Sequence, residues 1–354
     1  MHRTMTTRFR QRDIERLRAL RQGFLEFESR GIDDAAPDYW QSAHDLELYE
    51  ESLGERIGWK WEAVLDELAA RGLLAGFVPP GTALLDWGCG AGVASRTLLR
   101  RVDAHAIPRV HLWDRSRLAR DHAATRIETR APSVEVVRES RAPESWTGLL
   151  LISHVLDELD DEGLRALLRL AGAAAGVLWV EPGSRRTSRR LSELRAELLA
   201  THRALAPCLH QAACGMLAEG NERHWCHLFG SVPRAAFTSP KWAQLKSELS
   251  LDLRSLPYSF LALQRNDLAG DASTPTAASR VLGRPRPSRG VLQLDLCRKD
   301  GIHSVRLLER LDRPLAKAIG KRPTRPWMLD ADWAEGRITR IEVVEDRPEG
   351  SDSA

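Results

Sequence analysis

One short segment constrains the fold more than any other part of the chain. Residues 86–92 read Asp-Trp-Gly-Cys-Gly-Ala-Gly, with an apolar run over 83–86 and a helix-like stretch over 93–101 on either side. Glycines permit a tight turn and let a ligand approach the backbone closely, and the start of a helix offers free N–H groups. A strand, a glycine turn and a helix in this order are typical of nucleotide-binding α/β sheets.

Short apolar runs alternate with helix-like segments over the next hundred residues. The runs are 110–114, 134–137, 149–153 and 177–180, and the helix-like segments are 116–130, 160–171 and 184–202. This alternation predicts a parallel sheet with helices on both faces. Right-handed crossovers then bring the C-terminal ends of the strands to one edge.

The segments outside this alternation differ in composition. Residues 13–78 have helical periodicity, residues 258–264 read as one further strand, and residues 266–290 are rich in Ala, Gly, Pro, Ser and Thr. We expect five regions: an N-terminal helical region (1–78), an α/β domain (79–265) with a Cys-rich segment (207–229), a linker (266–290), a basic β-rich module (291–345) and a disordered tail (346–354).

Composition narrows the class of protein. The chain has 354 residues, of which 43% are hydrophobic, and this excludes a mostly disordered chain. No run reaches the roughly 20 apolar residues of a membrane-spanning helix, and no apolar signal-peptide core is present. We therefore expect a soluble, cytoplasmic protein without a membrane partner, acting as a monomer.

Basic charge is concentrated in one segment. Residues 280–326 hold thirteen Lys or Arg against four acids, while the whole chain carries only +3. Such a segment favours a polyanionic partner such as RNA. A second basic group (Arg185, Arg186, Arg189 and Arg190) either grips phosphates or forms a solvated helix face.

The glycine turn resembles the first motif of class I S-adenosylmethionine-dependent methyltransferases. In that family the loop contacts the methionine part of the cofactor, and an acid after the next strand holds the ribose hydroxyls through a charge-assisted contact. Asp114, 28 positions after Asp86, matches this acid, and residues 153–159 resemble the loop beside the methyl group. The resemblance implies as cofactor-binding residues Asp86, Gly88, Gly90, Gly92, Asp114 and His154. A nicotinamide-binding fold and a plain tight turn are the alternatives.

Four of the five cysteines form a candidate metal site. Cys89 lies inside the glycine turn, where a small residue is needed, whereas the others are Cys208, Cys214, Cys226 and Cys297. Four thiolates can hold zinc or an iron–sulfur cluster, yet the intervals of five, eleven and seventy residues match no zinc knuckle. Ordinary buried cysteines are the alternative. Three nearby histidines can replace one thiolate: His210, His224 and His227.

A second resemblance covers roughly residues 45–330. The segments Pro207-Cys208-Leu209-His210 and Trp225-Cys226-His227, with Cys297 later in the chain, resemble the mitoribosomal small-subunit methyltransferase-like family (Rsm-twenty-two type) and its bacterial members. In that family four cysteines ligate a [4Fe–4S] cluster and the protein acts on assembly of the small ribosomal subunit. The resemblance implies cluster ligation by the four cysteines named above. It also implies binding to the small subunit or its rRNA, for which we assign segment 280–326 and the four arginines.

These observations predict an α/β protein with a doubly wound, Rossmann-like class I methyltransferase sheet, N-terminal helices, a Cys-rich metal-binding insertion and a β-rich C-terminal module. The implied activity is methyl transfer from S-adenosylmethionine to the small subunit or its rRNA. A non-catalytic assembly factor and a small-molecule methyltransferase with structural zinc are the alternatives. No catalytic residue is assigned, because the acids and histidine at strand ends serve equally as bases or caps: His154, Asp157, Glu158 and Glu181.

Overall fold

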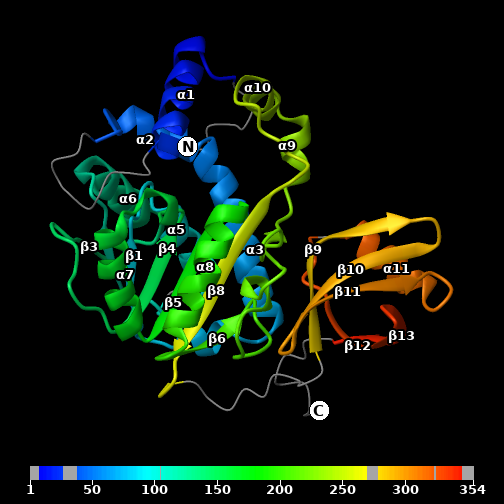
Figure 1. Cartoon of the computed structure of the whole chain (residues 1–354). Coiled ribbons are helices and arrows are strands. Elements are labelled where there is room, and N and C mark those ends of the chain that lie inside the picture. Colours follow the sequence, from blue (N-terminus) through cyan, green and yellow to red (C-terminus); the bar gives the residue numbers. More distant parts are fainter. Residues whose placement is uncertain (1–7, 27–37, 104, 269–277, 323, 345–354) are drawn as a thin grey trace, which may run out of the picture. The chain divides into compact units, whose positions relative to one another are not determined.

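A computed structural model describes residues 8–26, 38–103, 105–268, 278–322 and 324–344 (Figure 1). The chain divides into two compact units. The first comprises residues 1–65, 78–174 and 231–256, and the second comprises 66–77, 175–230 and 257–354. None of the helices in the described ranges combines the length and apolarity that crossing a bilayer requires.

The first unit contains the predicted parallel strands. They are β1 (Ala83–Trp87), β2 (Arg109–Trp113), β3 (Glu135–Arg138) and β4 (Leu149–Ser153), in the order β3-β2-β1-β4. The connecting segments are α5 (Val93–Leu99), α6 (Arg117–Arg130), the 3-10 turn η1 (Leu156–Glu158) and α7 (Asp161–Ala173). The register pairs Asp86 with Leu112 and Leu151, so Asp86 is on a central strand at its C-terminal end.

Helices from both ends of the first unit's sequence pack together. They are α1 (Gln11–Glu26), α2 (Ala43–Glu50), α3 (Leu53–Ala70), α9 (Arg234–Thr238) and α10 (Pro240–Glu248). Ile14 and Leu17 share an apolar cluster with Trp242, and Arg16 donates to both oxygens of Asp45 at 2.9 and 2.6 Å. The helical expectation for the N-terminal region is confirmed over the described residues.

In the second unit, the strands that extend the α/β sheet pair antiparallel with β8 (Pro257–Arg265). The elements of this part of the unit are α4 (Leu74–Phe77), β5 (Gly176–Pro182), α8 (Arg185–Leu198), β6 (His202–Ala206), η2 (Gly215–Leu217), β7 (Leu228–Phe229) and β8. The partners of β8 are β5, β6 and β7. The α/β sheet is therefore mixed rather than parallel throughout, because β8 runs back along β5.

A closed five-stranded barrel completes the second unit. It consists of β9 (Ala278–Ser288), β10 (Val291–Arg298), β11 (Gly301–Leu308), α11 (Arg313–Lys321), β12 (Met328–Ala334) and β13 (Arg337–Val343). The strand order is β10-β11-β13-β12-β9. Leu294, Leu307 and Leu329 are fully buried inside it with Ile319 of α11. This confirms the β-rich module predicted from the alternating pattern.

The predicted linker is wrong over residues 278–288, which form strand β9 of the barrel. Residues 278–282 are buried in consecutive positions, whereas most of 283–288 is exposed. The polar, Pro-containing second half therefore resembled a linker, although it pairs with β10. Residues 269–277 of the predicted linker and the predicted tail 346–354 lie outside the described residues.

Candidate functional site

The glycine turn after β1 adopts a conformation that requires glycine. The φ angles are +71° at Gly88, +49° at Gly90 and +68° at Gly92, a region that other residues rarely adopt. A Cβ on Gly88 would lie 2.6 Å from Val155, and one on Gly92 would lie 2.9 Å from Ala123. Nothing lies within 4 Å of the corresponding position on Gly90. Two glycines are thus needed for packing, and the third faces open space.

Asp114 connects this turn to the end of β2. Its Oδ2 accepts from the N–H of Gly90 at 2.8 Å, and its Oδ1 accepts from the N–H of Ser116 at 2.9 Å. Burial raises the pKa of Asp114, although both hydrogen bonds oppose this shift. The turn is also held by the carbonyl of Trp113, which accepts from the N–H groups of Gly88 and Cys89 at 2.8 and 3.0 Å. The structure therefore brings together the acid and the loop named from sequence.

Asp86 is a fully buried carboxyl group at the end of β1. Its Oδ2 accepts from the backbone N–H of Ser95 at 3.3 Å and from the Ser95 hydroxyl. Its Oδ1 has no hydrogen-bond partner among the described residues. Burial raises the pKa of Asp86 to about 6, and the charge of Asp114 adds to this increase. A buried acceptor without a donor is costly, so Asp86 is suited to a ligand that brings a donor or a positive charge.

His154 follows β4 and also has positive φ, at +59°. Its Nε2 lies 3.3 Å from Nζ of Lys60 on α3. Burial, followed by the positive charge of Lys60, lowers the pKa of His154 well below its ordinary value, so the imidazole is neutral. The preceding Ser153 Oγ accepts from Nε1 of Trp61 at 2.9 Å. Strained backbone of this kind clusters at functional sites.

The N-terminal helical region contributes side chains near Asp114 that sequence reasoning did not name. The pKa of Tyr39 and that of Tyr49 are both raised, first by burial and then by the charges of Glu158 and Asp114. These two tyrosines therefore lie near the acids that follow β2 and β4. The only sequence signal was the aromatic content of 39–49, which is equally typical of helix packing.

Glu181, also considered as a base, is fully buried at the end of β5. Its Oε1 accepts from Nε1 of Trp179 at 2.7 Å. This contact gives Glu181 a structural role within the second unit.

Four cysteines line one pocket in the second unit. Cys208 follows β6, Cys214 precedes η2, Cys226 precedes β7, and Cys297 lies in β10. Each of the six pairs among these thiols interacts electrostatically, and burial raises the pKa of Cys208, Cys226 and Cys297. Thiols from segments seventy residues apart are therefore gathered at one place.

Two buried arginines accompany the thiols. Arg195 of α8 donates to the carbonyls of Ala212 and His210 at 3.1 and 2.8 Å, while its Nε has no partner among the described residues. Arg280 of β9 donates to both oxygens of Glu67 at 2.6 and 2.7 Å. Both positive charges lower the pKa of Cys208 and of Cys297, opposing the effect of burial.

The three histidines near the cysteines have different surroundings. His210 lines the pocket, and its Nε2 lies 3.6 Å from Sγ of Cys297. His227 stacks on Trp225 with ring centroids 4.8 Å apart, and His224 is exposed. Within the described ranges, no group of three or more His, Cys, Asp or Glu side chains is arranged to hold a metal ion, so the structure does not show the predicted metal site.

The arginines assigned to phosphate binding have, in part, other roles. Nη1 of Arg189 donates to the carbonyls of Met216, Asn221 and His224 at 2.8, 3.0 and 3.0 Å. Nε of Arg185 donates to the Glu222 carbonyl at 2.9 Å. Arg185 and Arg189 therefore anchor the Cys-rich segment to α8. The sequence could not predict this role, because it depends on how the loop folds back against the helix. Arg280, within the basic segment 280–326, is 3% exposed and is not a surface cation.

Comparison with known proteins gave one family and several structures. The family described as "Mitochondrial small ribosomal subunit Rsm22" matches residues 62–312, well over half of the chain. A search of curated proteins gave no match.

Several solved structures that match are described as methyltransferases, and their sequence identity to this chain is low. A SAM-dependent methyltransferase from Leishmania major is 12% identical, with 71% of this chain and 86% of that chain covered and a TM-score of 0.36. One from Aquifex aeolicus is 16% identical, with 47% and 90% covered and a TM-score of 0.34. The O-methyltransferase NcsB1, solved with S-adenosylmethionine, is 17% identical, with 55% and 65% covered and a TM-score of 0.36.

The structure has a Rossmann-like methyltransferase fold with a mixed α/β sheet and a small C-terminal barrel. The features that identify the fold are the strand order of the first unit, the antiparallel strand β8 and the glycine turn. The family match covers this sheet, the cysteines and most of the barrel. The chain therefore belongs to the family described as mitochondrial small ribosomal subunit Rsm22.

Proposed function

We propose that this protein is an S-adenosylmethionine-dependent methyltransferase-like protein that acts on the small ribosomal subunit or its rRNA and carries a [4Fe–4S] cluster. The observation that carries the methyltransferase part is the arrangement of Asp86, Gly90 and Asp114. It offers a buried carboxylate oxygen without a donor, open space over a glycine, and a second buried acid hydrogen-bonded to the same loop.

In this proposal each predicted cofactor residue has a distinct role. Gly88 and Gly92 shape the turn, and Gly90 leaves room for the ligand. Asp86 accepts from, or balances the charge of, the methionine amino group, and Asp114 accepts from the ribose hydroxyls. The neutral imidazole of His154 lies at the end of β4. The cofactor supplies an electrophilic methyl group when bound, and the protein contributes mainly proximity and orientation.

The four cysteines are proposed as the ligands of the cluster. A zinc ion holds thiolates at about 2.3 Å, which places the sulfur atoms within about 3.8 Å of one another. A cubane of iron and sulfide holds them farther apart. The four thiols line one pocket, and no group of His, Cys, Asp or Glu among the described residues has the arrangement of a metal-ion site. The choice of a cluster over zinc therefore rests on the family resemblance and not on the geometry of the thiols.

A buried arginine supports the same assignment. Four thiolates around one inorganic centre concentrate negative charge in a region of low dielectric, where uncompensated charge is costly. Arg195 lines the pocket and brings a positive charge to it, whereas the charge of Arg280 is already balanced by Glu67. The Nε–H of Arg195 has no acceptor among the described residues, so it can donate to a sulfur of the cluster, a contact that tunes such centres.

A cluster held in this way joins distant parts of the second unit. Cys297 belongs to the barrel, whereas the other three ligands belong to segment 207–229. Binding would therefore close a long loop and couple cluster loading to folding of the barrel.

The ribosomal part of the proposal rests on charge and family. Most basic residues of segment 280–326 are exposed on the barrel, and the matched family is described by its association with the small ribosomal subunit. Exposed cations supply the sequence-independent part of RNA binding.

A non-catalytic assembly factor is the second candidate, and one observation favours it. Nε2 of His154 lies 3.3 Å from Lys60, so the imidazole at the end of β4 is engaged rather than poised as a base. In this case subunit binding survives Asp86→Ala and is lost with Cys208→Ser. A small-molecule methyltransferase with structural zinc is the third, and it predicts no salt-sensitive RNA binding.

The decisive experiment uses full-length protein purified anaerobically. Broad absorbance near the blue edge of the visible spectrum, together with iron and sulfide, supports the cluster, whereas zinc alone refutes it. Calorimetry with S-adenosylmethionine tests the cofactor site, and absence of binding at millimolar concentration would refute it. Transfer of a labelled methyl group to purified small subunits separates the enzyme from the assembly factor.

A further inference from the structure

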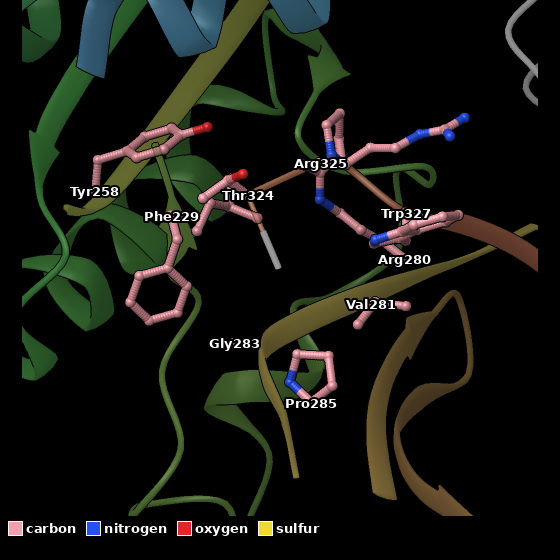
Figure 2. A pocket seen from close by; sticks show the side chains of 11 residues that line it. Phe229, Tyr258, Arg280, Val281, Gly283, Pro285, Thr324, Arg325 and Trp327 are labelled. Carbon is pink, nitrogen blue, oxygen red and sulfur yellow. The ribbon is translucent and has the colours of Figure 1, made fainter. Parts of the chain in front are cut away.

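A second pocket in the second unit lies where the barrel meets the edge of β7 and β8 (Figure 2). Tyr258 and Phe229 lie on one side, with Trp327 and Arg280 on the other. The enclosed space is about 20 Å³, enough for a single small group such as an oxygen atom and not for a whole base. None of the proposed cofactor residues or cysteines lines it.

Two arginines are stacked on aromatic rings that line this pocket, and of the two only Arg325 lines the pocket itself. The guanidinium carbon of Arg284 lies 4.4 Å from the ring centroid of Phe229, and that of Arg325 lies 4.5 Å from the ring centroid of Trp327. Both arginines are exposed, whereas Phe229 and Trp327 are buried beneath them. Stacking of this kind holds a guanidinium plane in position and leaves its outer face accessible to a base.

The floor of the pocket holds a buried polar group that lacks a partner. Arg280 is 3% exposed, and its Nη atoms are engaged with Glu67 and with the Pro207 carbonyl. Its Nε–H has no acceptor among the described residues. An unpaired buried donor is costly, so this position is suited to a ligand that brings a carbonyl oxygen.

The surroundings of the pocket are basic. Lys317, Lys321 and Arg322 lie exposed on α11 and at its end, shortly before Arg325 in the chain. Within the described ranges none of these three forms an ion pair with an acid. A phosphate backbone is the complement of such a surface.

The barrel itself has the connectivity of an OB-fold. Three antiparallel strands (β9 to β11) precede a helix and two further strands, and β11 closes the barrel by running parallel to β13. OB-folds bind single-stranded nucleic acid by combining a basic groove with aromatic stacking. Here the cations and the aromatic rings come together at the pocket described above.

We propose that this pocket and the two stacked arginines together bind an unpaired nucleotide within single-stranded RNA, with only a keto oxygen of the base entering the pocket. A keto oxygen of the base accepts from the Arg280 Nε–H, the base stacks on a guanidinium plane, and the flanking phosphates contact Arg284 and Arg325. This inference rests on the proposed ribosomal function and names the RNA feature that the barrel recognises.

The test measures binding of the full-length protein to a fluorescein-labelled, uridine-rich single strand of about 12 nucleotides, within the site size of one OB-fold. The double variant Arg284→Glu/Arg325→Glu is compared with Arg310→Glu/Arg313→Glu. The control reverses two exposed charges of the same module that do not line the pocket. We expect the pocket variant to bind roughly 10-fold or more weakly. For the pocket variant, the slope of log affinity against log salt concentration should be shallower by about 1.4, the value for two lost phosphate contacts on a single strand.

A 4-thiouridine crosslink gives a second readout, since it should map to peptides containing Phe229, Arg284 or Trp327. Equal loss in both double variants, equal affinity for a duplex of the same sequence, or crosslinks elsewhere would overturn the proposal. Binding of free uridine monophosphate without strand binding would also overturn it. Small-subunit association of the wild-type protein is measured in parallel. If association persists while the pocket variant behaves like the control, the inference fails and the ribosomal function stands.

Discussion

The glycine turn and the cysteine pocket are assembled in opposite ways. The turn and its acid, Asp114, lie within 29 residues of sequence on neighbouring strands of the first unit. The cysteine pocket draws on four segments between 208 and 297 and depends on the folding of the barrel. In the turn the backbone and two carboxylates at the ends of adjoining strands form the site, whereas in the pocket side chains from distant segments do so.

This difference shows how each site depends on the rest of the molecule. Backbone N–H groups and glycine dihedrals are fixed once β1, α5 and β2 form. The thiols converge only if β10 is in register with β9, where Cys297 is paired with Arg280. We therefore expect substitutions at one site to leave the other intact, and the following predictions test that independence.

The largest effect is expected from Cys297→Ser, which removes the one proposed ligand contributed by the barrel. Iron and sulfide should be lost almost completely, and the free energy of unfolding should fall by about 2–5 kcal/mol, as when a crosslink is removed. Metal analysis and denaturant titration measure the two effects. Cys89→Ser is the matched control, because Cys89 is buried in the glycine turn and should leave the iron content unchanged. Retention of iron by Cys297→Ser would contradict the ligand assignment.

The next effect is expected from Asp114→Asn on cofactor affinity. A hydrogen bond to a charged group contributes about 1.5–3 kcal/mol, so the Kd for S-adenosylmethionine should rise roughly 10- to 150-fold. Asp121→Asn, a partly exposed acid on α6, serves as the control in the same calorimetric assay. The cluster content of both variants should equal that of the wild type. An unchanged Kd would show that Asp114 only anchors the loop through Gly90 and Ser116.

A comparison of two glycines separates packing from ligand contact. Gly88→Ala places a Cβ against Val155 at a φ of +71°, so it should lower stability and cofactor affinity together. Gly90→Ala meets no neighbouring atom and should cost only about 1–2 kcal/mol of stability for its left-handed backbone. Its affinity for S-adenosylmethionine should nevertheless fall about 10-fold or more if the cofactor lies over Gly90. Thermal melts and calorimetry distinguish the two cases.

The smallest effect is the pH dependence that Asp86 imposes on stability. Its pKa is raised from 3.8 to about 6 in the folded state, so the folded protein binds more protons than the unfolded chain between these values. The cost of ionising Asp86 in the folded state is absent below about pH 4, where the carboxyl group is protonated in both states. This cost grows as the pH rises to about 6 and stays at about 3 kcal/mol above that pH.

Asp86→Asn should remove this penalty, so that the variant gains stability relative to the wild type as the pH rises from 4 to 7. The same variant should bind S-adenosylmethionine more weakly, since it lacks the negative charge. Melting temperatures of both proteins across this pH range provide the measurement. A stability difference that does not change with pH would show that Asp86 is not the titrating group.

The sequence predicted the α/β part well because its signals are local. The apolar runs at 83–86, 110–114 and 149–153 correspond within one residue to strands β1, β2 and β4, and the positions of the glycines and acids followed from strand ends. Strand β9 was missed because its exposed half carries Arg and Pro, which composition alone assigns to a linker. Lys60, Tyr39 and Tyr49 were missed because nothing in their local sequence distinguishes a residue near the proposed cofactor site from a packed helix residue.

By itself, the sequence determined the glycine turn, its acid and the existence of a β-rich module, since backbone conformation and burial pattern depend on neighbours within a few residues. Only the tertiary structure decided that four thiols share a pocket, that Arg189 holds the Cys-rich loop, and that Arg284 and Arg325 stack on rings beside one cavity. These contacts join segments separated by tens of residues. Their formation depends on strand register and chain reversal, which no local pattern encodes.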